Sequence, residues 1–97
     1  MIQQDPSSTF ARYGLAMEYL AQGNTDAALA AFATCIEHNP DYVPAFQRSA
    51  QTLAKLGRNA EALDRIEAGL AAATCTGNQH AHAELTAMQE ELKHGAA

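Results

Sequence analysis

The stretch Gln22–Phe32, QGNTDAALAAF, decides the fold because a helix stop is followed at once by a helix start. Gly23 and Asn24 can end a helix in the left-handed conformation, Thr25 can cap the next helix, and the alanine-rich run favours helix. The same arrangement returns 34 residues later as LGRNAEALDRI, Leu56–Ile66. The two stretches therefore predict two helical hairpins built alike.

Apolar residues recur at the spacing of one helix face along the whole chain. This pattern predicts five helices, at about 8–22, 25–38, 42–56, 59–75 and 79–93. Ser7 or Ser8 is the expected cap of the first helix and Asn78 that of the fifth, while Pro40 and Gly57 follow the second and third. The positions expected to face inward are Ala11, Leu15, Ala16, Tyr19 and Leu20; Ala28, Leu29, Phe32, Cys35 and Ile36; Phe46, Ala50 and Leu53; Leu63, Ile66 and Leu70; and Ala81, Leu85, Met88 and Leu92.

Composition and charge exclude several classes of protein. The 97 residues suit one small domain, and its net charge of -5, with six scattered Lys or Arg, argues against a nucleic-acid or anionic-membrane partner. The start, MIQQDPSSTF, lacks the basic and apolar parts of a secretory signal, and no run is apolar enough to span a membrane. We therefore expect a cytoplasmic protein.

Under the 34-residue shift, the matches concentrate on small residues and turn formers. The matched pairs are Pro6 and Pro40, Ala11 and Ala45, Ala16 and Ala50, Gly23 and Gly57, Ala28 and Ala62, Leu29 and Leu63, and Phe32 and Ile66. Small residues are needed where two helices cross closely. A 34-residue period of helix–turn–helix units is the spacing of tetratricopeptide repeats.

Over about residues 5–75 the chain resembles the tetratricopeptide repeat family, and NPDYVPAF resembles its short bacterial two-repeat proteins. The matching residues are Leu15, Ala16, Tyr19, Gly23, Ala28, Phe32 and Pro40 in the first unit and Phe46, Ala50, Leu53, Gly57, Ala62 and Ile66 in the second. Three positions depart from the pattern. Arg12 stands where the family has a large aromatic residue, Ser49 stands where it has a leucine, and Thr74 stands where it has the closing proline. We expect Phe10 and Tyr13 to compensate for Arg12.

The resemblance implies an all-α fold of two tandem helix–turn–helix hairpins and a C-terminal capping helix, a segment of right-handed α-solenoid. We expect one domain over residues 1–97, with repeats at about 7–40 and 41–75 and the cap at about 79–93. Two repeats fall below the usual minimum of about three. The fifth helix or a second copy of the chain must therefore complete the core.

The sequence holds no pattern of catalytic or metal-binding residues. Cys35 and Cys75 are expected more than about 7 Å apart, so both thiols should stay reduced, with Cys35 a small core residue. His80 and His82 point to different sides of a helix, whereas a helical metal pair needs a spacing of three or four. We expect no enzymatic activity, no metal and no cofactor.

The resemblance implies a protein-binding adaptor that holds a peptide or a partner helix in a concave groove lined by the first helix of each hairpin. The positions it assigns to this groove are Phe10, Tyr13, Met17 and Ala21 from the first helix and Gln47, Arg48, Gln51 and Lys55 from the third. Arg and Lys there can engage a carboxylate. Tyr13 and Met17 take two places that a clamp for acidic C-termini needs, so we do not expect such a clamp.

Two alternatives stay open. Phe10, Tyr13 and Met17 could serve only to complete the first hairpin rather than to bind a partner. The protein could also be a self-associating structural unit, a homodimer whose groove or end face pairs with a second copy.

Overall fold

The computed structural model describes residues 8–95 of the chain, which form five helices and no strand. The helices are α1 (Thr9–Ala21), α2 (Thr25–His38), α3 (Val43–Lys55), α4 (Asn59–Thr76) and α5 (Gln79–Gly95). All five predicted helices are confirmed, with ends that differ by at most two residues. Pro6 and Ser7, which the repeat pattern and the capping prediction used, lie outside the described residues.

Side-chain caps and left-handed glycines set the ends of the helices. Ser8 accepts a hydrogen bond from the backbone N–H of Ala11 at 3.1 Å, and Asn78 accepts one from Ala81 at 3.0 Å, as predicted. The prediction for α2 was wrong by one residue, because Asn24 is the cap and Thr25 is the first helical residue. Gly23, Gly57 and Gly77 each follow a helix with φ between 71° and 79°, a region that favours glycine.

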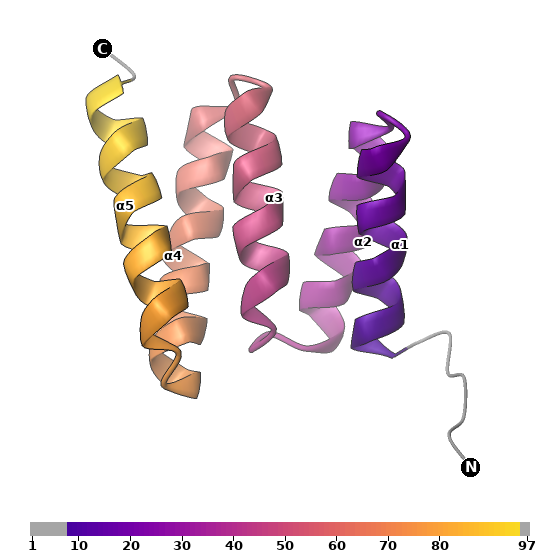
Figure 1. The fold of residues 1–97 in the computed structure, drawn as a ribbon, viewed down its shortest axis with the longest axis horizontal. Coiled ribbons are helices and arrows are strands. Elements are labelled where there is room, and N and C mark those ends of the chain that lie inside the picture. The colour runs from indigo at the N-terminus through magenta and orange to yellow at the C-terminus, as the bar shows by residue number, and fades with distance from the viewer. Residues whose placement is uncertain (1–7, 96–97) are drawn as a thin grey trace.

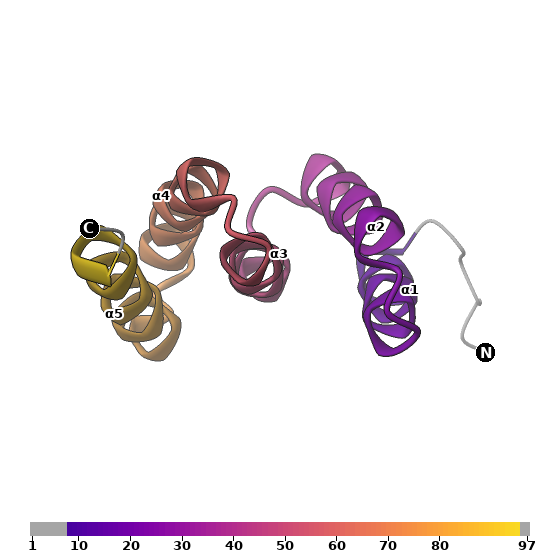
Figure 2. The ribbon, with the colours of Figure 1, turned by 90° about the horizontal axis from the view of Figure 1, so that it is seen from above.

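The helices form two hairpins, α1 with α2 and α3 with α4, and α5 packs against α4 (Figure 1). Seen from above, α1, α3 and α5 lie in one layer and α2 and α4 in the other (Figure 2). The helices α1, α3 and α5 all run in the same direction, because each hairpin turns the chain back on itself. This is the expected all-α solenoid arrangement.

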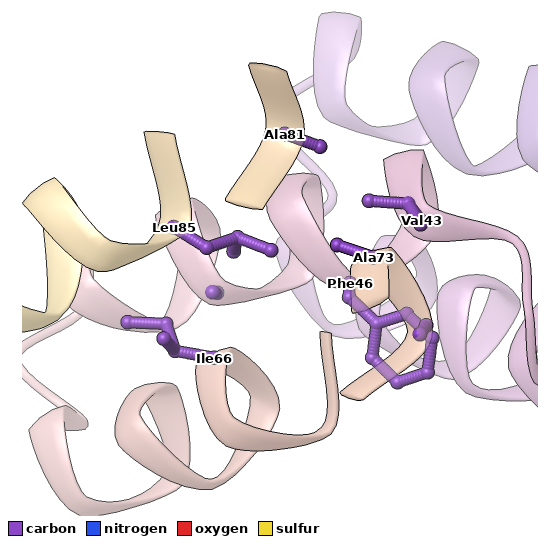
Figure 3. Close-up of a cluster of buried hydrophobic side chains, with 8 residues drawn as sticks. Val43, Phe46, Ile66, Ala73, Ala81 and Leu85 are labelled. Carbon is purple, nitrogen blue, oxygen red and sulfur yellow. The ribbon is translucent and has the colours of Figure 1, made fainter. Parts of the chain in front are cut away.

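Buried side chains gather in two clusters, one for each hairpin. The first cluster consists of Ala16, Ala28, Phe32, Cys35 and Ala45, and the second of Val43, Phe46, Ala50, Ile66, Ala72, Ala73, Ala81 and Leu85. Figure 3 shows side chains from α3, α4 and α5 meeting in the second cluster. The fifth helix therefore buries its predicted inward positions Ala81 and Leu85 against the second hairpin.

The predicted inward face of α1 was partly wrong. Ala11 is exposed, and Leu15 keeps 49% of its surface exposed, although both fall on the apolar stripe. The buried face is instead centred on Ala16, with Tyr13 and Met17 packed against the first cluster. The reason is that Leu15 lines a hollow formed by α1 and α2 alone, so no further described helix covers it.

The departures from the repeat pattern are accommodated locally. Ser49 is buried, and its hydroxyl donates to the carbonyl of Ala45, one turn earlier in α3, at 2.7 Å. Tyr13 packs against Phe32 with ring centroids 5.9 Å apart and against Tyr42 at 5.4 Å. Tyr13 thus supplies the aromatic contact that Arg12 lacks, as expected, whereas Phe10 stays exposed.

Gly69 marks the closest approach between α4 and its neighbours. A Cβ atom at this position would lie 2.9 Å from Cβ of Phe46 and 3.1 Å from Cδ1 of Leu85. We therefore expect Gly69→Ala to lower the free energy of unfolding, because overpacking costs about 2 kcal/mol and outweighs the gain of about 1 kcal/mol in helix propensity. Urea unfolding followed by circular dichroism measures the change.

Gly14 provides the matched control, because it lies within α1 and a Cβ there would meet nothing within 4 Å. Gly14→Ala should raise the free energy of unfolding by about 0.5–1 kcal/mol, since only the helix propensity changes. Equal stabilisation by both substitutions would contradict the close packing of α3, α4 and α5.

The two cysteines are both free, and they differ in exposure. Burial raises the pKa of the Cys35 thiol, whose sulfur lies 3.6 Å from the carbonyl oxygen of Thr9. Because the thiolate is the reactive form, we expect a thiol reagent at neutral pH to modify Cys75 rapidly and Cys35 only after unfolding. Mass spectrometry of the native and the urea-unfolded protein should show one and two adducts; two rapid adducts in the native state would contradict the buried position of Cys35.

Candidate partner-binding groove

The layer formed by α1, α3 and α5 has a concave outer side. Figure 2 shows α3 set back between α1 and α5, which lie on either side of it. Both helices that the repeat pattern assigns to a groove, α1 and α3, lie on this side. Two hollows in this surface flank α3.

The first hollow lies between α1 and α3. It has a volume of about 250 Å³ and is lined by Leu20, Thr25, Arg48, Gln51, Thr52, Lys55 and Leu56. Its charged groups are the cations of α3, and its apolar part comes from the two leucines. Leu56, which directly follows α3, keeps 44% of its surface exposed.

The second hollow lies between α3 and α5. Its volume is about 630 Å³, and its lining consists of Gln51, Ala54, Lys55, Glu84, Ala87, Met88, Glu91 and Leu92. Near its lower end the side-chain amide of Gln47 donates to Oε1 of Glu84 at 2.8 Å, which ties α3 to α5. The hollow therefore has an apolar base of Ala, Met and Leu side chains and a charged rim.

The structure brings part of the expected site together on α3. Gln51 and Lys55 line both hollows, and Arg48 lines the first and donates to Oε1 of Gln51 at 3.4 Å. Gln47 lines neither hollow and instead makes the bond to Glu84 that joins the two helices. These four side chains share the side of α3 that is turned toward the hollows.

The expected residues of α1 are arranged differently. Tyr13 and Met17 are partly buried against the first cluster, and Phe10, with 78% of its surface exposed, lines neither hollow. Burial and the neighbouring Tyr13 raise the pKa of Tyr42, which packs in the same aromatic group. Leu20, near the end of α1, faces the first hollow instead.

Sequence reasoning did not assign any residue of α5 to the groove. Glu84, Ala87, Met88, Glu91 and Leu92 nevertheless line the larger hollow. A signal was present, because α5 follows the second hairpin in the place where a third repeat would put its first helix. Treating α5 as a cap alone concealed its second role.

Three further hollows lie outside the concave side. One lies at the turn between α4 and α5 and is lined by Ala73, Thr74, Gly77, Asn78, Gln79, His82 and Ala83. Another is formed by α1 and α2 alone and is lined by Arg12, Leu15, Tyr19, Ala27, Ala30, Ala31 and Thr34. The third lies between α2 and α4 and includes Arg58 and Glu61, whose side chains pair at 2.7 Å. Hydrogen bonding to Arg58 holds the pKa of Glu61 below its usual range.

The histidines lie at exposed positions on helix surfaces. His80 approaches Glu84 at 3.2 Å and His94 approaches Glu90 at 3.3 Å, in each case one helical turn apart. Within residues 8–95 no group of three or more His, Cys, Asp and Glu side chains could hold a metal ion. None of the described helices combines the length and the apolar character needed to cross a membrane.

Comparison with known proteins supports the repeat architecture. The sequence profile of the tetratricopeptide repeat matches residues 19–87. A solution NMR structure of a tetratricopeptide repeat domain protein from Salinibacter ruber is 32% identical, with a TM-score of 0.86 over 92% of this chain and 90% of that one. A crystal structure of a tetratricopeptide repeat domain protein from Salinibacter ruber is 31% identical, with a TM-score of 0.83 over 89% of this chain and 97% of that one.

Comparison with curated proteins found no match. Tetratricopeptide repeats are generally a protein-interaction fold without catalytic activity, so the architecture is that of an interaction or scaffold module. The profile covers well over half of the chain, and the two solved structures share its helices almost throughout. This protein belongs to the tetratricopeptide repeat family.

Proposed function

We propose that the protein is an adaptor that binds a peptide or a partner helix along its concave side. The observation that carries this proposal is the pair of hollows on either side of α3, which share Gln51 and Lys55. Together they form a groove with apolar floor segments and a few polar groups, the usual composition of a binding site. Side chains on rigid helices hold such a site in one geometry.

The groove should select peptides from a random 12-residue library displayed on phage. A selected peptide, synthesised with a fluorescent label, gives the dissociation constant by fluorescence anisotropy. Because Gln51 is exposed between the two hollows, we expect Gln51→Trp to fill the groove and to weaken binding at least about tenfold.

The matched control for this experiment is Ala71→Trp, at an exposed position on α4 that lines none of the described hollows. It should leave binding unchanged, and circular dichroism should show the same helicity for both variants. Equal binding by the two variants would place the ligand elsewhere, and a library that yields no binding peptide would rule out the adaptor function.

A second candidate function is a homodimer formed through the outer end of the first hairpin. The repeat symmetry supports it: the equivalents of Leu15 and Tyr19 in the second repeat are Ser49 and Leu53, which are 1% and 4% exposed. The same positions are thus covered in the second repeat, whereas in the first repeat Leu15 keeps 49% of its surface exposed and Tyr19 is only half-buried. A second copy turned by a two-fold rotation would cover the exposed Leu15 of both copies at once.

Light scattering coupled to gel filtration tests this second candidate at micromolar concentration. A dimer would have twice the 10.3 kDa mass of the chain, and Leu15→Glu should return it to the monomer, because the introduced charge would be buried in the interface. Leu56→Glu is the matched control, since Leu56 is similarly exposed but faces the groove. A monomer at every concentration would exclude this candidate, and dissociation by Leu56→Glu alone would move the interface to the groove.

A further inference from the structure

The charged side chains that line the groove are sorted by helix. Arg48 and Lys55 come from α3, and Glu84 and Glu91 come from α5. In both pairs the members are seven residues apart, which is about two helical turns, so each pair occupies one face of its helix. One positive row and one negative row therefore run along the groove.

The two rows are held in register by the contact between Gln47 and Glu84. The helices α3 and α5 run in the same direction (Figure 1), and seven positions further on Ala54 and Glu91 line the same hollow, together with Lys55. The negative row thus lies on the far wall of the larger hollow. The positive row lies on α3, where Arg48 lines the first hollow and Lys55 lines both.

Between the rows the surface is apolar. Ala54, Ala87, Met88 and Leu92 form this part of the larger hollow, and Met88 and Leu92 also pack against the second core cluster. Met adapts its shape to what it contacts. A volume of about 630 Å³ is ample for an aliphatic side chain.

Within residues 8–95, the cations of the groove have no ion-pair partner. Arg48 hydrogen-bonds only the neutral Gln51, and among residues 8–95 neither Arg48 nor Lys55 forms an ion pair, whereas Arg58 pairs with Glu61. In a chain of net charge -5, this leaves a positive row available to an acidic group. Glu91 likewise forms no ion pair within the described residues.

Resting on the proposed adaptor function, we propose that the ligand is a peptide segment with charges of both signs around an aliphatic anchor. The anchor enters the hollow over Met88 and Leu92, a basic residue pairs with Glu91 on α5, and an acidic residue pairs with Arg48 or Lys55 on α3. Ligands of a single charge sign would meet repulsion from one of the two rows. The charges therefore select the partner more than they add to its affinity.

The test uses peptides selected by the wild-type protein from the 12-residue phage library and measures their binding by fluorescence anisotropy at low salt. The selected peptides should carry an aliphatic residue with a basic residue on one side and an acidic residue on the other. Glu91→Lys should weaken their binding about tenfold, because it turns an attraction into a repulsion. Replacing the basic residue of the peptide by Glu should restore binding to Glu91→Lys.

Matched controls separate local pairing from the overall charge. Glu90→Lys makes the same charge change at the neighbouring exposed position, which lines no described hollow, and should change binding less than about twofold. Lys55→Glu should weaken binding like Glu91→Lys, whereas Lys93→Glu, outside the described hollows, should not.

The possible outcomes distinguish this inference from the function on which it rests. If the selected peptides bind, but Glu91→Lys and Glu90→Lys act alike, the charge arrangement is refuted and the adaptor function stands. Selected peptides of one charge sign would likewise refute the charge arrangement alone. If no peptide is selected, the adaptor function fails and this inference fails with it. If Glu91→Lys converts a dimer into a monomer, the occupant is a second copy of the chain and the inference is overturned.

Discussion

The architecture depends on how closely the helices can approach one another. At Gly69 the backbone of α4 lies so near α3 and α5 that even a methyl group would collide with Phe46. Ala16, Ala28 and Ala50, small residues of the repeat pattern, are also fully buried. Because α5 packs closely against the second hairpin, it lies near enough to α3 for Gln47 to hydrogen-bond Glu84. The larger hollow lies between these two helices.

The two hollows of the candidate groove lie over parts of the core that are packed differently. The hollow between α3 and α5 lies over the larger core cluster, to which three helices contribute. The hollow between α1 and α3 lies at the junction of the two hairpins. Few core residues connect the hairpins there: Ile36 packs against both clusters, and Tyr42 and Ala45 belong to the first cluster or pack against it. Because fewer buried contacts hold this junction, a change in the width of the first hollow costs less free energy than a change in the hollow between α3 and α5.

The helices and turns could be predicted from the sequence because their signals are local. Gly57 and Asn78 act on the residues beside them, and the repeat fixes the positions of Ala28 and Ala62 in each hairpin. The exposure of Leu15 could not be predicted, because periodicity defines a helix face but not what covers it. For the same reason the repeat pattern could place Gln51 and Lys55 beside a groove, whereas the contribution of Met88 and Glu91 emerged only from the position of α5.

The substitution of an arginine for the aromatic anchor in the first repeat has a consequence for recognition. Without that anchor the first hairpin uses Tyr13 for its own core, where the ring packs against Phe32 and Tyr42. If the Tyr13 side chain turned outward to contact a ligand, the first cluster would lose these ring contacts and the protein would be less stable. The surface left for a partner is therefore richest on α3 and α5, the helices supported by the larger cluster. Because Tyr13 compensates for Arg12 in the core of the first hairpin, the candidate binding surface lies mainly on α3 and α5 rather than on α1.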